Sequence, residues 1–388
     1  MAARLRVPRE DDFRSRLRDE RVSARIGLWL GLAFAVCFAS GLLSHGAQHP
    51  PAWFSWPTRP VGLYRVTQGL HVLTGIAAIP LLLAKLYSVY PRLFVWPPVR
   101  SPVHALERLS VLVLMGAAFF QLVTGVLNVA QWYAFGFPFP STHFAVAWVA
   151  VGAIVVHVGV KLPVIRRALG TPLEVEPVAD GRPPGVPRAG VVSRRTFLSG
   201  TGLAAGAAVV ATAGMAVPWL RDVSVLAVRS GDGPQGLPVN TSAAAAGVTP
   251  RATGPAYRLG LSGPDGERRL TLEDLRAMRQ HRVTLPISCV EGWSASGDWS
   301  GLRVADLVRL VGGSPEADVR FTSLERGGAW SQSVLPAAHA RDPLTLLALR
   351  LNGEVLHPDH GFPCRLIAPS RPGVLQTKWV HRVEVLKA

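Results

Sequence analysis

The sequence predicts a multi-domain protein: an N-terminal all-α transmembrane four-helix bundle, then a fifth transmembrane helix, then a soluble α+β domain. Three observations lead to this prediction. Four apolar runs lie between residues 26 and 162, each near the length of about 20 residues that spans a bilayer. A fifth apolar run covers residues 200–220. From Arg221 onward the chain alternates short strand and helix patterns separated by turn residues.

Charge and hydropathy together indicate a membrane protein. The chain has 388 residues and a formal net charge of +16, with a mean hydropathy of +0.26 and a pI of 11.1. Its basic residues stand beside the apolar runs, a placement that positive-inside topology explains better than nucleic-acid binding does. We therefore expect membrane lipid, and no nucleic acid, among the partners. Three cysteines imply no disulfide framework.

The first 25 residues are predicted to be a cytoplasmic tail, because their arginines directly precede the first apolar run. That run covers residues 26–43 and opens the predicted four-helix domain, residues 26–170. A cleaved signal peptide is the alternative, which the further spans disfavour. Trp53 and Trp56 follow in a loop that we expect outside, at the level of an aromatic belt.

The loops between the remaining spans alternate in charge as the predicted topology requires. The second, third and fourth spans are expected at residues 63–87, 104–130 and 142–162. Arg92 and Arg100 follow the second span, Trp132 and Tyr133 the third, and Lys161, Arg166 and Arg167 the end of the fourth. The basic loops belong inside and the aromatic loop outside.

Histidines within apolar runs are costly and need a functional reason. His143 and His157 are fourteen residues apart on the fourth span, within about 40° of one helical face and about 21 Å apart along the axis. His71 lies near the depth of His143, and His104 near that of His157. A bis-histidine b haem takes one imidazole from each of two facing helices. The spacing predicts an outer haem between His71 and His143, and an inner one between His104 and His157. For His104, a solvated interfacial histidine is the alternative.

The pattern of His71, His143 and His157 resembles the four-helix di-haem cytochrome b subunits of formate dehydrogenases and related hydrogenases. The resemblance implies one or two b haems that exchange electrons with the quinone/quinol pool. The remaining ligand of that family lies on the first span, and this chain has no histidine at the inner start of that span. The ligands of the inner haem therefore stay open.

Residues 171–192 form a linker by composition, and residues 193–220 are predicted to be a signal and a fifth transmembrane helix. Ser193-Arg194-Arg195-Thr196-Phe197-Leu198 fits a twin-arginine export signal, so the Tat translocon is an expected partner. The alternative is a helix whose two arginines only set its orientation. The small residues around 213–216 offer a cleavage site, and the sequence leaves open whether the chain is cut there.

Residues 221–388 are predicted to be an extracytoplasmic α+β domain. Its expected strands cover residues 256–261, 284–289, 317–323 and 383–386, and its expected helices residues 271–280 and 306–311. Cys289 stands where a strand gives way to a loop, which is a common place for chemistry. Most lone cysteines are structural, so this assignment needs a second motif.

The second motif is Asp359-His360-Gly361-Phe362-Pro363-Cys364-Arg365, followed by Gln376-Thr377-Lys378-Trp379. With the stretch from Pro286 to Ser294 it resembles the molybdopterin-binding domain of the sulfite-oxidase family. The resemblance implies that Cys289 is the catalytic residue and that its thiolate ligates molybdenum. It also implies that both motifs line the pterin and its phosphate, with Asn240, Ser288, Cys289, Val290, Arg365, Gln376 and Lys378 as the cofactor-binding residues.

These motifs predict a multi-pass protein of the cell membrane, a molybdopterin-dependent oxidoreductase that links an extracytoplasmic molybdenum site to the quinone pool through b haems. The expected reaction is oxygen-atom transfer on a small substrate that contains sulfur or nitrogen, as in a methionine sulfoxide reductase. A sulfite dehydrogenase is one alternative; for sulfite an arginine cluster is expected, which Arg303, Arg365 and Arg371 would have to form. A membrane electron conduit with a non-catalytic docking module is the other. The direction of electron flow stays open.

Overall fold

The computed structural model describes residues 15–51, 53–97, 99–173, 192–227, 233–328 and 330–387. Most of the predicted tail (residues 1–14) and most of the predicted linker (residues 174–191) lie outside the described residues. The chain divides into two compact units, each of which combines two segments. One unit comprises Met1–Ala39 and His71–Val210, and the other comprises Ser40–Leu70 and Ala211–Ala388.

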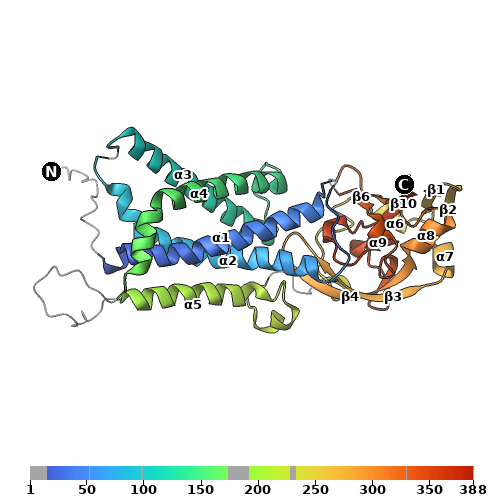
Figure 1. The fold of residues 1–388 in the computed structure, drawn as a ribbon. Helices are drawn as coiled ribbons and strands as arrows, with labels where there is room; N and C mark the ends of the chain where they lie inside the picture. Colours follow the sequence, from blue (N-terminus) through green and yellow to red (C-terminus); the bar gives the residue numbers. More distant parts are fainter. Residues whose placement is uncertain are drawn as a thin grey trace, which may run out of the picture. The chain divides into compact units, whose positions relative to one another are not determined.

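Long apolar helices make up the N-terminal part of the chain (Figure 1). Within the described ranges, five helices are long and apolar enough to cross a membrane. They are α1 (Glu20–Gln48), α2 (Leu63–Val89), α3 (Pro102–Val129), α4 (Phe139–Gly170) and α5 (Arg194–Ala213). The first four predicted spans fall within these helices to within one residue, whereas α5 begins before the fifth predicted run and ends at Ala213, so residues 214–220 of that run lie beyond the helix.

Small and aliphatic side chains hold the helices of the first unit together. Leu30 of α1, Leu81 of α2, Ala118 of α3 and Ala205 of α5 are buried in one apolar cluster. Helix α4 packs against α3. Alanine at such positions allows helix backbones to approach closely, which favours association where no water drives it.

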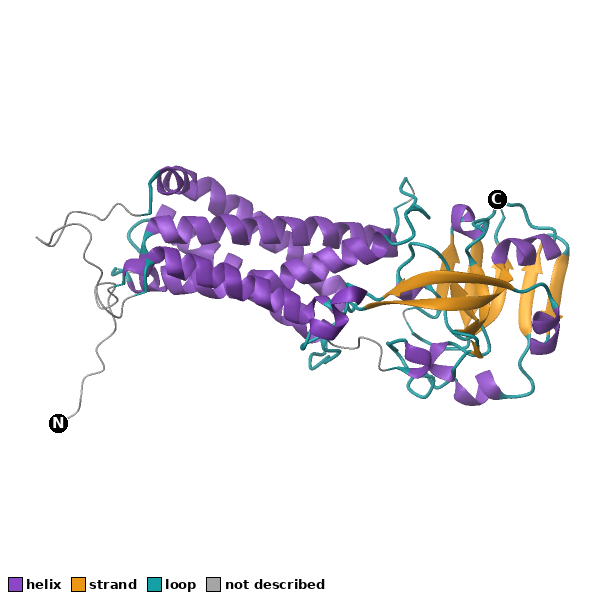
Figure 2. Cartoon of the chain, turned by 90° about the horizontal axis from the view of Figure 1, so that it is seen from below, coloured by secondary structure: helices purple, strands orange, loops and turns teal. Residues whose placement is uncertain are grey.

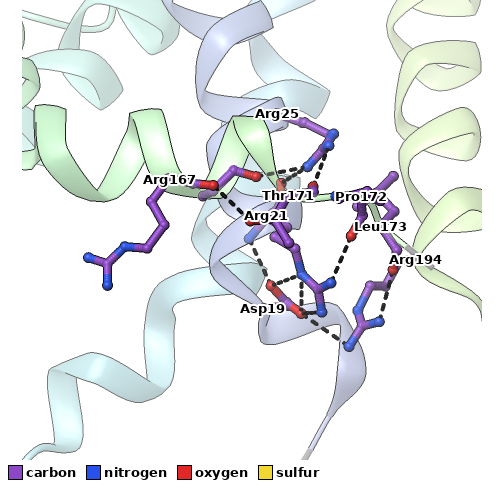
Figure 3. A network of polar contacts seen from close by, with 9 residues as sticks. Asp19, Arg21, Arg25, Arg167, Thr171, Pro172, Leu173 and Arg194 are labelled. Carbon is purple, nitrogen blue, oxygen red and sulfur yellow. Dashed lines mark hydrogen bonds and ion pairs between the residues drawn. The ribbon is translucent and has the colours of Figure 1, made fainter. Parts of the chain in front are cut away.

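A polar network joins the ends of three segments of this unit (Figure 3). The Asp19 carboxylate, just before α1, forms ion pairs with Arg21 at 2.7 Å and with Arg194 of α5 at 3.1 Å. Arg21 Nη1 donates to the Pro172 carbonyl at 2.8 Å, and Arg25 Nη2 donates to the Thr171 carbonyl at 3.1 Å. These two carbonyls lie just after α4, so the arginines satisfy main-chain acceptors there and tie the start of α1 to the end of α4 and the start of α5.

Strands characterise the second unit (Figure 2). In the part of the chain that the structure describes, they form two sheets, one of order β2-β1-β10-β5-β6 and one of order β3-β4-β7-β8 in which β9 also pairs with β7. Strand β1 pairs in parallel with β10, and the other neighbours are antiparallel. The strands are β1 (Leu259–Gly263), β2 (Gly266–Leu270), β3 (His281–Ser288), β4 (Ser294–Arg303), β5 (Val319–Ser323), β6 (Gln332–Leu335), β7 (Leu346–Leu351), β8 (Glu354–Val355), β9 (Arg365–Ile367) and β10 (Val380–Val385).

Four short helices accompany the strands in the described residues: α6 (Thr249–Thr253), α7 (Leu272–Ala277), α8 (Val304–Leu310) and α9 (Ala337–Ala340). One buried apolar cluster draws on both sheets, with Leu261 and Phe321 from the first and Leu347 from the second. The predicted strands and helices of this unit are confirmed, with boundaries shifted by a few residues. Thr271 caps α7 through a capping box with Asp274, as the expected threonine cap requires.

The segment from residue 40 to residue 70 packs within the second unit. Trp56 is buried, and its indole Nε1 donates to the Ser370 carbonyl at 2.6 Å. Arg59 forms an ion pair with Asp342 at 2.8 Å. The predicted aromatic belt is therefore wrong for Trp56, because its N–H has an acceptor inside the protein. Trp53 remains exposed.

The chain that follows α5 also belongs to this unit. The carbonyl of Met215 accepts a hydrogen bond of 2.7 Å from the main-chain N–H of Ser294, the first residue of β4. Gly214 N–H donates to Ser224 Oγ at 2.7 Å. The residues around the predicted cleavage stretch are buried, with Ala213, Met215 and Ala216 all below 5 % exposed.

Candidate molybdopterin site

Cys289 occupies the tight connection between β3 and β4. Its N–H donates to the Trp293 carbonyl at 2.9 Å, and the N–H of Gly292 donates back to the Cys289 carbonyl at 3.1 Å. Gly292 has a φ of +97°, a conformation that glycine adopts without steric cost. The strand signal and the Gly-containing turn thus fix the position of the thiol, as the sequence predicts.

The thiol is shielded from solvent, with Cys289 only 2 % exposed. Burial raises the pKa of Cys289 well above its usual value, and the nearby Glu291 adds to the effect. The thiol is therefore neutral in the protein alone. A bound metal ion would reverse this, because coordination deprotonates a thiol. The buried Cys289 sulfur is therefore chemically suited to be a metal ligand rather than an exposed nucleophile.

Cys289 lines a pocket together with four of the other predicted cofactor residues: Asn240, Arg365, Gln376 and Lys378. The pocket draws on both sheets and on the loops between their strands. Trp293, Thr377 and Trp379 of the two predicted motifs also line the pocket, and further lining comes from residues outside those motifs, among them Glu325, Trp330 and Val374. His360 also lines the pocket and belongs to the second motif.

Two cations, the buried Arg365 and the half-buried Lys378, line this pocket without a carboxylate ion pair among the described residues. Arg365 is 3 % exposed, and its Nη1 and Nη2 donate to the carbonyls of His360 and Gln376 at 3.1 and 3.2 Å. Lys378 Nζ donates to Asn240 Oδ1 at 3.0 Å and to main-chain carbonyls. Among the described residues, neither cation forms an ion pair with a carboxylate. Burial lowers the pKa of Arg365 to about 9 and that of Lys378 to about 7.

Two polar atoms of the residues that line the pocket lack a hydrogen-bond partner among the described residues. Arg365 Nε and Gln376 Oε1 are buried and make no hydrogen bond to the described residues. An unsatisfied buried polar atom costs about 1–3 kcal/mol, so the pocket is incomplete without a ligand. A ligand with an anionic tail and with both donors and acceptors would satisfy these atoms. Molybdopterin has this chemistry, so the residues present fit the cofactor.

Two predicted cofactor residues lie beside the pocket rather than in its lining. Ser288 Oγ hydrogen-bonds to Ser294 Oγ at 2.7 Å, and the Val290 carbonyl accepts from Gln68 Nε2 at 3.0 Å. The segment around Cys364 lines the pocket, as predicted, through Asp359, His360 and Arg365. Cys364 itself, which was not among the predicted cofactor residues, is buried in the apolar core. Its sulfur contacts Tyr257 Oη at 3.2 Å.

Of the three arginines considered for sulfite binding, only Arg365 is among the described residues that line the pocket. Arg371 is buried, and its guanidinium donates to the main-chain carbonyls of Leu375 and Val334. Arg303 caps the start of α8 outside the pocket lining. The described part of the pocket therefore contains no arginine cluster.

The membrane histidines fall into one close pair and two separate residues. The rings of His71 on α2 and His143 on α4 lie 6.2 Å apart, centroid to centroid. His71 Nδ1 lies 2.8 Å from the Cys37 carbonyl, and His143 Nδ1 lies 3.1 Å from Thr124 Oγ1. When Nδ1 of each ring donates to an oxygen, Nε2 keeps its lone pair for a metal.

No contact joins His104 and His157 in the described part of the helices. His104 Nδ1 accepts from the N–H of Arg100 at 3.2 Å, and the N–H of His104 donates to Ser101 Oγ at 3.1 Å. These contacts belong to the start of α3. The structure therefore brings together the predicted outer pair but not the predicted inner pair.

Comparison with known proteins identifies the pocket-bearing part of the chain. Residues 246–388 match the family model of the oxidoreductase molybdopterin binding domain. This match covers the β-sheets, the Cys289 turn and the second motif. The C-terminal part of the chain is therefore a sulfite-oxidase-like molybdopterin-binding domain of an oxidoreductase.

Curated relatives agree with this assignment. The chain is 33 % identical over 159 residues to mitochondrial sulfite oxidase of Drosophila melanogaster, covering 33 % of this chain and 27 % of that protein. It is 30 % identical over 165 residues to sulfite oxidase of Arabidopsis thaliana, covering 34 % and 42 %. It is 34 % identical over 132 residues to the putative protein-methionine-sulfoxide reductase subunit YedZ1 of Azospira oryzae, covering 34 % and 49 %. The chain thus spans less than half the length of each of these relatives.

Proposed function

We propose that this chain is a membrane-bound, molybdopterin-dependent oxidoreductase that passes electrons between an extracytoplasmic molybdenum site and the quinone pool through b haem. One observation carries the proposal: a buried cysteine thiol lines a single pocket together with the buried Arg365 and the half-buried Lys378, neither of which forms an ion pair with a carboxylate of the described residues. A thiolate supplies a metal ligand, and the cations compensate an anionic tail. The match to the molybdopterin-binding family supports this reading.

The protein positions the cofactor, and the cofactor supplies the redox chemistry. Bound molybdenum supports two-electron oxygen-atom chemistry. Cys289 would hold the metal through its sulfur. Arg365 and Lys378 would hold the phosphate, and Gln376 Oε1 would accept a hydrogen bond from the pterin. Asn240 keeps the Lys378 ammonium in place through its Oδ1 atom.

The composition of the second unit supports an odd number of membrane spans. The loop between α1 and α2 and the C-terminal domain belong to that one compact unit, so we propose that they lie on one side of a membrane. Between them the chain runs through α2, α3, α4 and α5, and these four crossings return it to the same side. Three crossings would not. Helix α5 is therefore proposed as a fifth span, and the basic inner loops place the domain outside. Arg194 and Arg195 at its start are proposed to direct twin-arginine export.

The proposed outer haem lies between His71 and His143. Their rings, on two different helices, have centroids 6.2 Å apart and planes 78° apart, and each ring has its Nδ1 next to an oxygen. Such contacts set the orientation of a ligating imidazole. His157 and His104 remain the candidates for an inner haem, in a four-helix cytochrome b-like bundle of α1 to α4. The similarity to YedZ1, which is named as a putative subunit of a protein-methionine-sulfoxide reductase, supports a redox function with a sulfoxide substrate.

The substrate is proposed to be a small oxide of sulfur or nitrogen, such as a sulfoxide. Trp293, Trp330 and Val374 give the pocket an apolar side, and the pocket lacks an arginine cluster in its described lining. A neutral substrate suits these residues better than a dianion does. The similarity to sulfite oxidases keeps sulfite dehydrogenase as the second candidate. A non-catalytic docking module is disfavoured. Such a module would have no use for a buried cysteine thiol that lines a pocket, whereas a molybdenum enzyme uses that thiol as a metal ligand.

Metal and haem analysis of the purified full-length protein tests the proposal. We expect molybdenum bound to the chain and at least one b haem in a pyridine haemochrome assay. A dye-linked screen with sulfoxides, N-oxides and sulfite then assigns the substrate. Absence of molybdenum from protein produced in a host with active cofactor synthesis would refute the enzyme assignment, and turnover of sulfite alone would select the second candidate.

A further inference from the structure

Two side chains from the first turns of α2 hold the turn that carries Cys289. Gln68 Nε2 donates to the Val290 carbonyl at 3.0 Å. Arg65 Nε donates to Ser294 Oγ at 2.7 Å. Arg65 and Gln68 are three residues apart and therefore share one face of the helix. Both contacts are made to residues that follow Cys289 in the chain. Helix α2 therefore fixes the segment between the thiol and the start of β4.

A buried network fixes the orientation of the Gln68 amide. Ser44 Oγ donates to Gln68 Oε1 at 2.8 Å and lies 3.0 Å from Tyr64 Oη. All three residues are buried. With its oxygen occupied, the amide presents its NH₂ group to the Val290 carbonyl. A fully satisfied buried network of this kind selects one side-chain conformation.

We propose that Gln68 is a positioning residue that couples the Cys289 turn electronically to α2. The inference rests on the proposed function. The route runs from Cys289 through one peptide to the Val290 carbonyl and across the hydrogen bond to Gln68. From there it follows α2 for three residues, about 4.5 Å of axial rise, to His71. Electrons tunnel faster along covalent and hydrogen bonds than through empty space over the same distance.

Electrons pass along this route one at a time. For each electron, one of the two centres, haem iron or molybdenum, is oxidised by one unit and the other is reduced by one. The quinone/quinol pool is the electron donor or acceptor on the haem side, and the substrate on the molybdenum side takes or gives a pair. Gln68 itself undergoes no net chemical change, because its amide only bridges the two segments.

The test replaces Gln68 with leucine, which removes the amide donor at similar size, and uses Gln48→Leu as the matched control. Gln48 Nε2 contacts Ser44 O and Oγ, so it belongs to the same network, but it does not reach the Cys289 turn. Gln68→Met provides a second variant that keeps the length of the side chain. All variants are made in the full-length protein loaded with its cofactors.

Three measurements separate electronic coupling from general damage. Stopped-flow absorbance follows the haem after substrate is mixed with enzyme poised in the opposite redox state. A soluble dye that exchanges electrons directly with the molybdenum site gives turnover independent of the haem. Hydrogen exchange of the amides in residues 290–294 reports the order of the turn. We expect Gln68→Leu to slow the haem-linked rate several-fold more than the dye-linked rate and to speed exchange in the turn. Gln48→Leu should change neither the ratio of the haem-linked rate to the dye-linked rate nor the amide exchange in the turn.

Two results would overturn the inference. Equal loss of haem-linked and dye-linked rates in Gln68→Leu would show a merely structural role. Wild-type haem-linked rates and wild-type exchange in both Gln68 variants would show that the contact has no role. Wild-type protein without haem or without molybdenum would instead refute the proposed function itself, and the route with it. The failure of one is therefore distinguishable from the failure of the other.

Discussion

The partly desolvated Lys378 ammonium predicts an unusual pH dependence of stability in the cofactor-free protein. Burial lowers the pKa of Lys378 to about 7, and the neighbouring Arg365 contributes in the same direction. In the unfolded chain this pKa is about 10.4. Between these values the folded state has released a proton that the unfolded state still binds. The free energy of unfolding therefore rises with pH through this window.

The magnitude follows from the two pKa values. Raising the pH from 7 to 8 should add about 1 kcal/mol to the free energy of unfolding, close to the limit of about 1.4 kcal/mol per pH unit for one proton. For a domain of this size that corresponds to a rise of roughly 2–4 °C in Tm. Above about pH 8.5 the effect is opposed, because burial also raises the pKa values of Cys289 and Cys364 while unfolded thiols ionise near 8.5.

The assay is thermal unfolding of the full-length protein in detergent, produced in a host that cannot make molybdopterin. Lys378→Met serves as the control, because it removes this titration and leaves the others. The rise between pH 7 and 8 should be lost in Lys378→Met. Pyrophosphate should flatten it in the wild type, since a bound anion favours the charged ammonium. Equal slopes in wild type and variant would refute the reasoning.

Three further predictions concern the thiol, the haem and export. Cys289→Ser should fold yet lose turnover by orders of magnitude and shift the molybdenum EPR signal, because an alkoxide is a harder, poorer donor than a thiolate. Cys364→Ser, in the core beside Tyr257, should keep activity and lower only Tm; the opposite outcome would mean that the ligand is misassigned. His71→Ala should reduce the pyridine haemochrome count, and an unchanged count would contradict the proposed pair. Replacing Arg194 and Arg195 together with lysine should leave the C-terminal domain inside, protected from protease added to spheroplasts, and undiminished digestion would exclude the export role.

Local patterns were sufficient for much of the fold. Apolar runs of membrane length became α1 to α5 because the hydrophobic signal of a span does not depend on its partners. The same holds for β3, whose β-branched run ends at Cys289, and for α7, whose Thr271 cap is a local feature. The pairing of His71 with His143 followed from depth alone.

Features that depend on tertiary contacts were not predictable from these patterns. Gln68 and Val290 are far apart in sequence, and nothing about a glutamine at the end of a span signals a contact with a distant turn. Trp56 fitted an interfacial belt by composition, and only the Ser370 carbonyl explains its burial. Cys364 and Arg365 are neighbours in one motif, but Cys364 is buried in the apolar core whereas Arg365, the first residue of β9, lines the pocket, because successive side chains of an extended chain alternate in direction.

The burial of the residues after α5 bears on how long that helix stays attached. A peptidase binds its cleavage site in an extended conformation, whereas Ala213 and Met215 lie in the turn that ends the helix. Met215 also accepts a main-chain hydrogen bond from β4, so cleavage there would require that this strand edge first come apart. A domain exported by the twin-arginine route crosses the membrane already folded, with this stretch already covered. On the proposed export route, we therefore expect α5 to stay covalently attached to the C-terminal domain as a permanent membrane anchor.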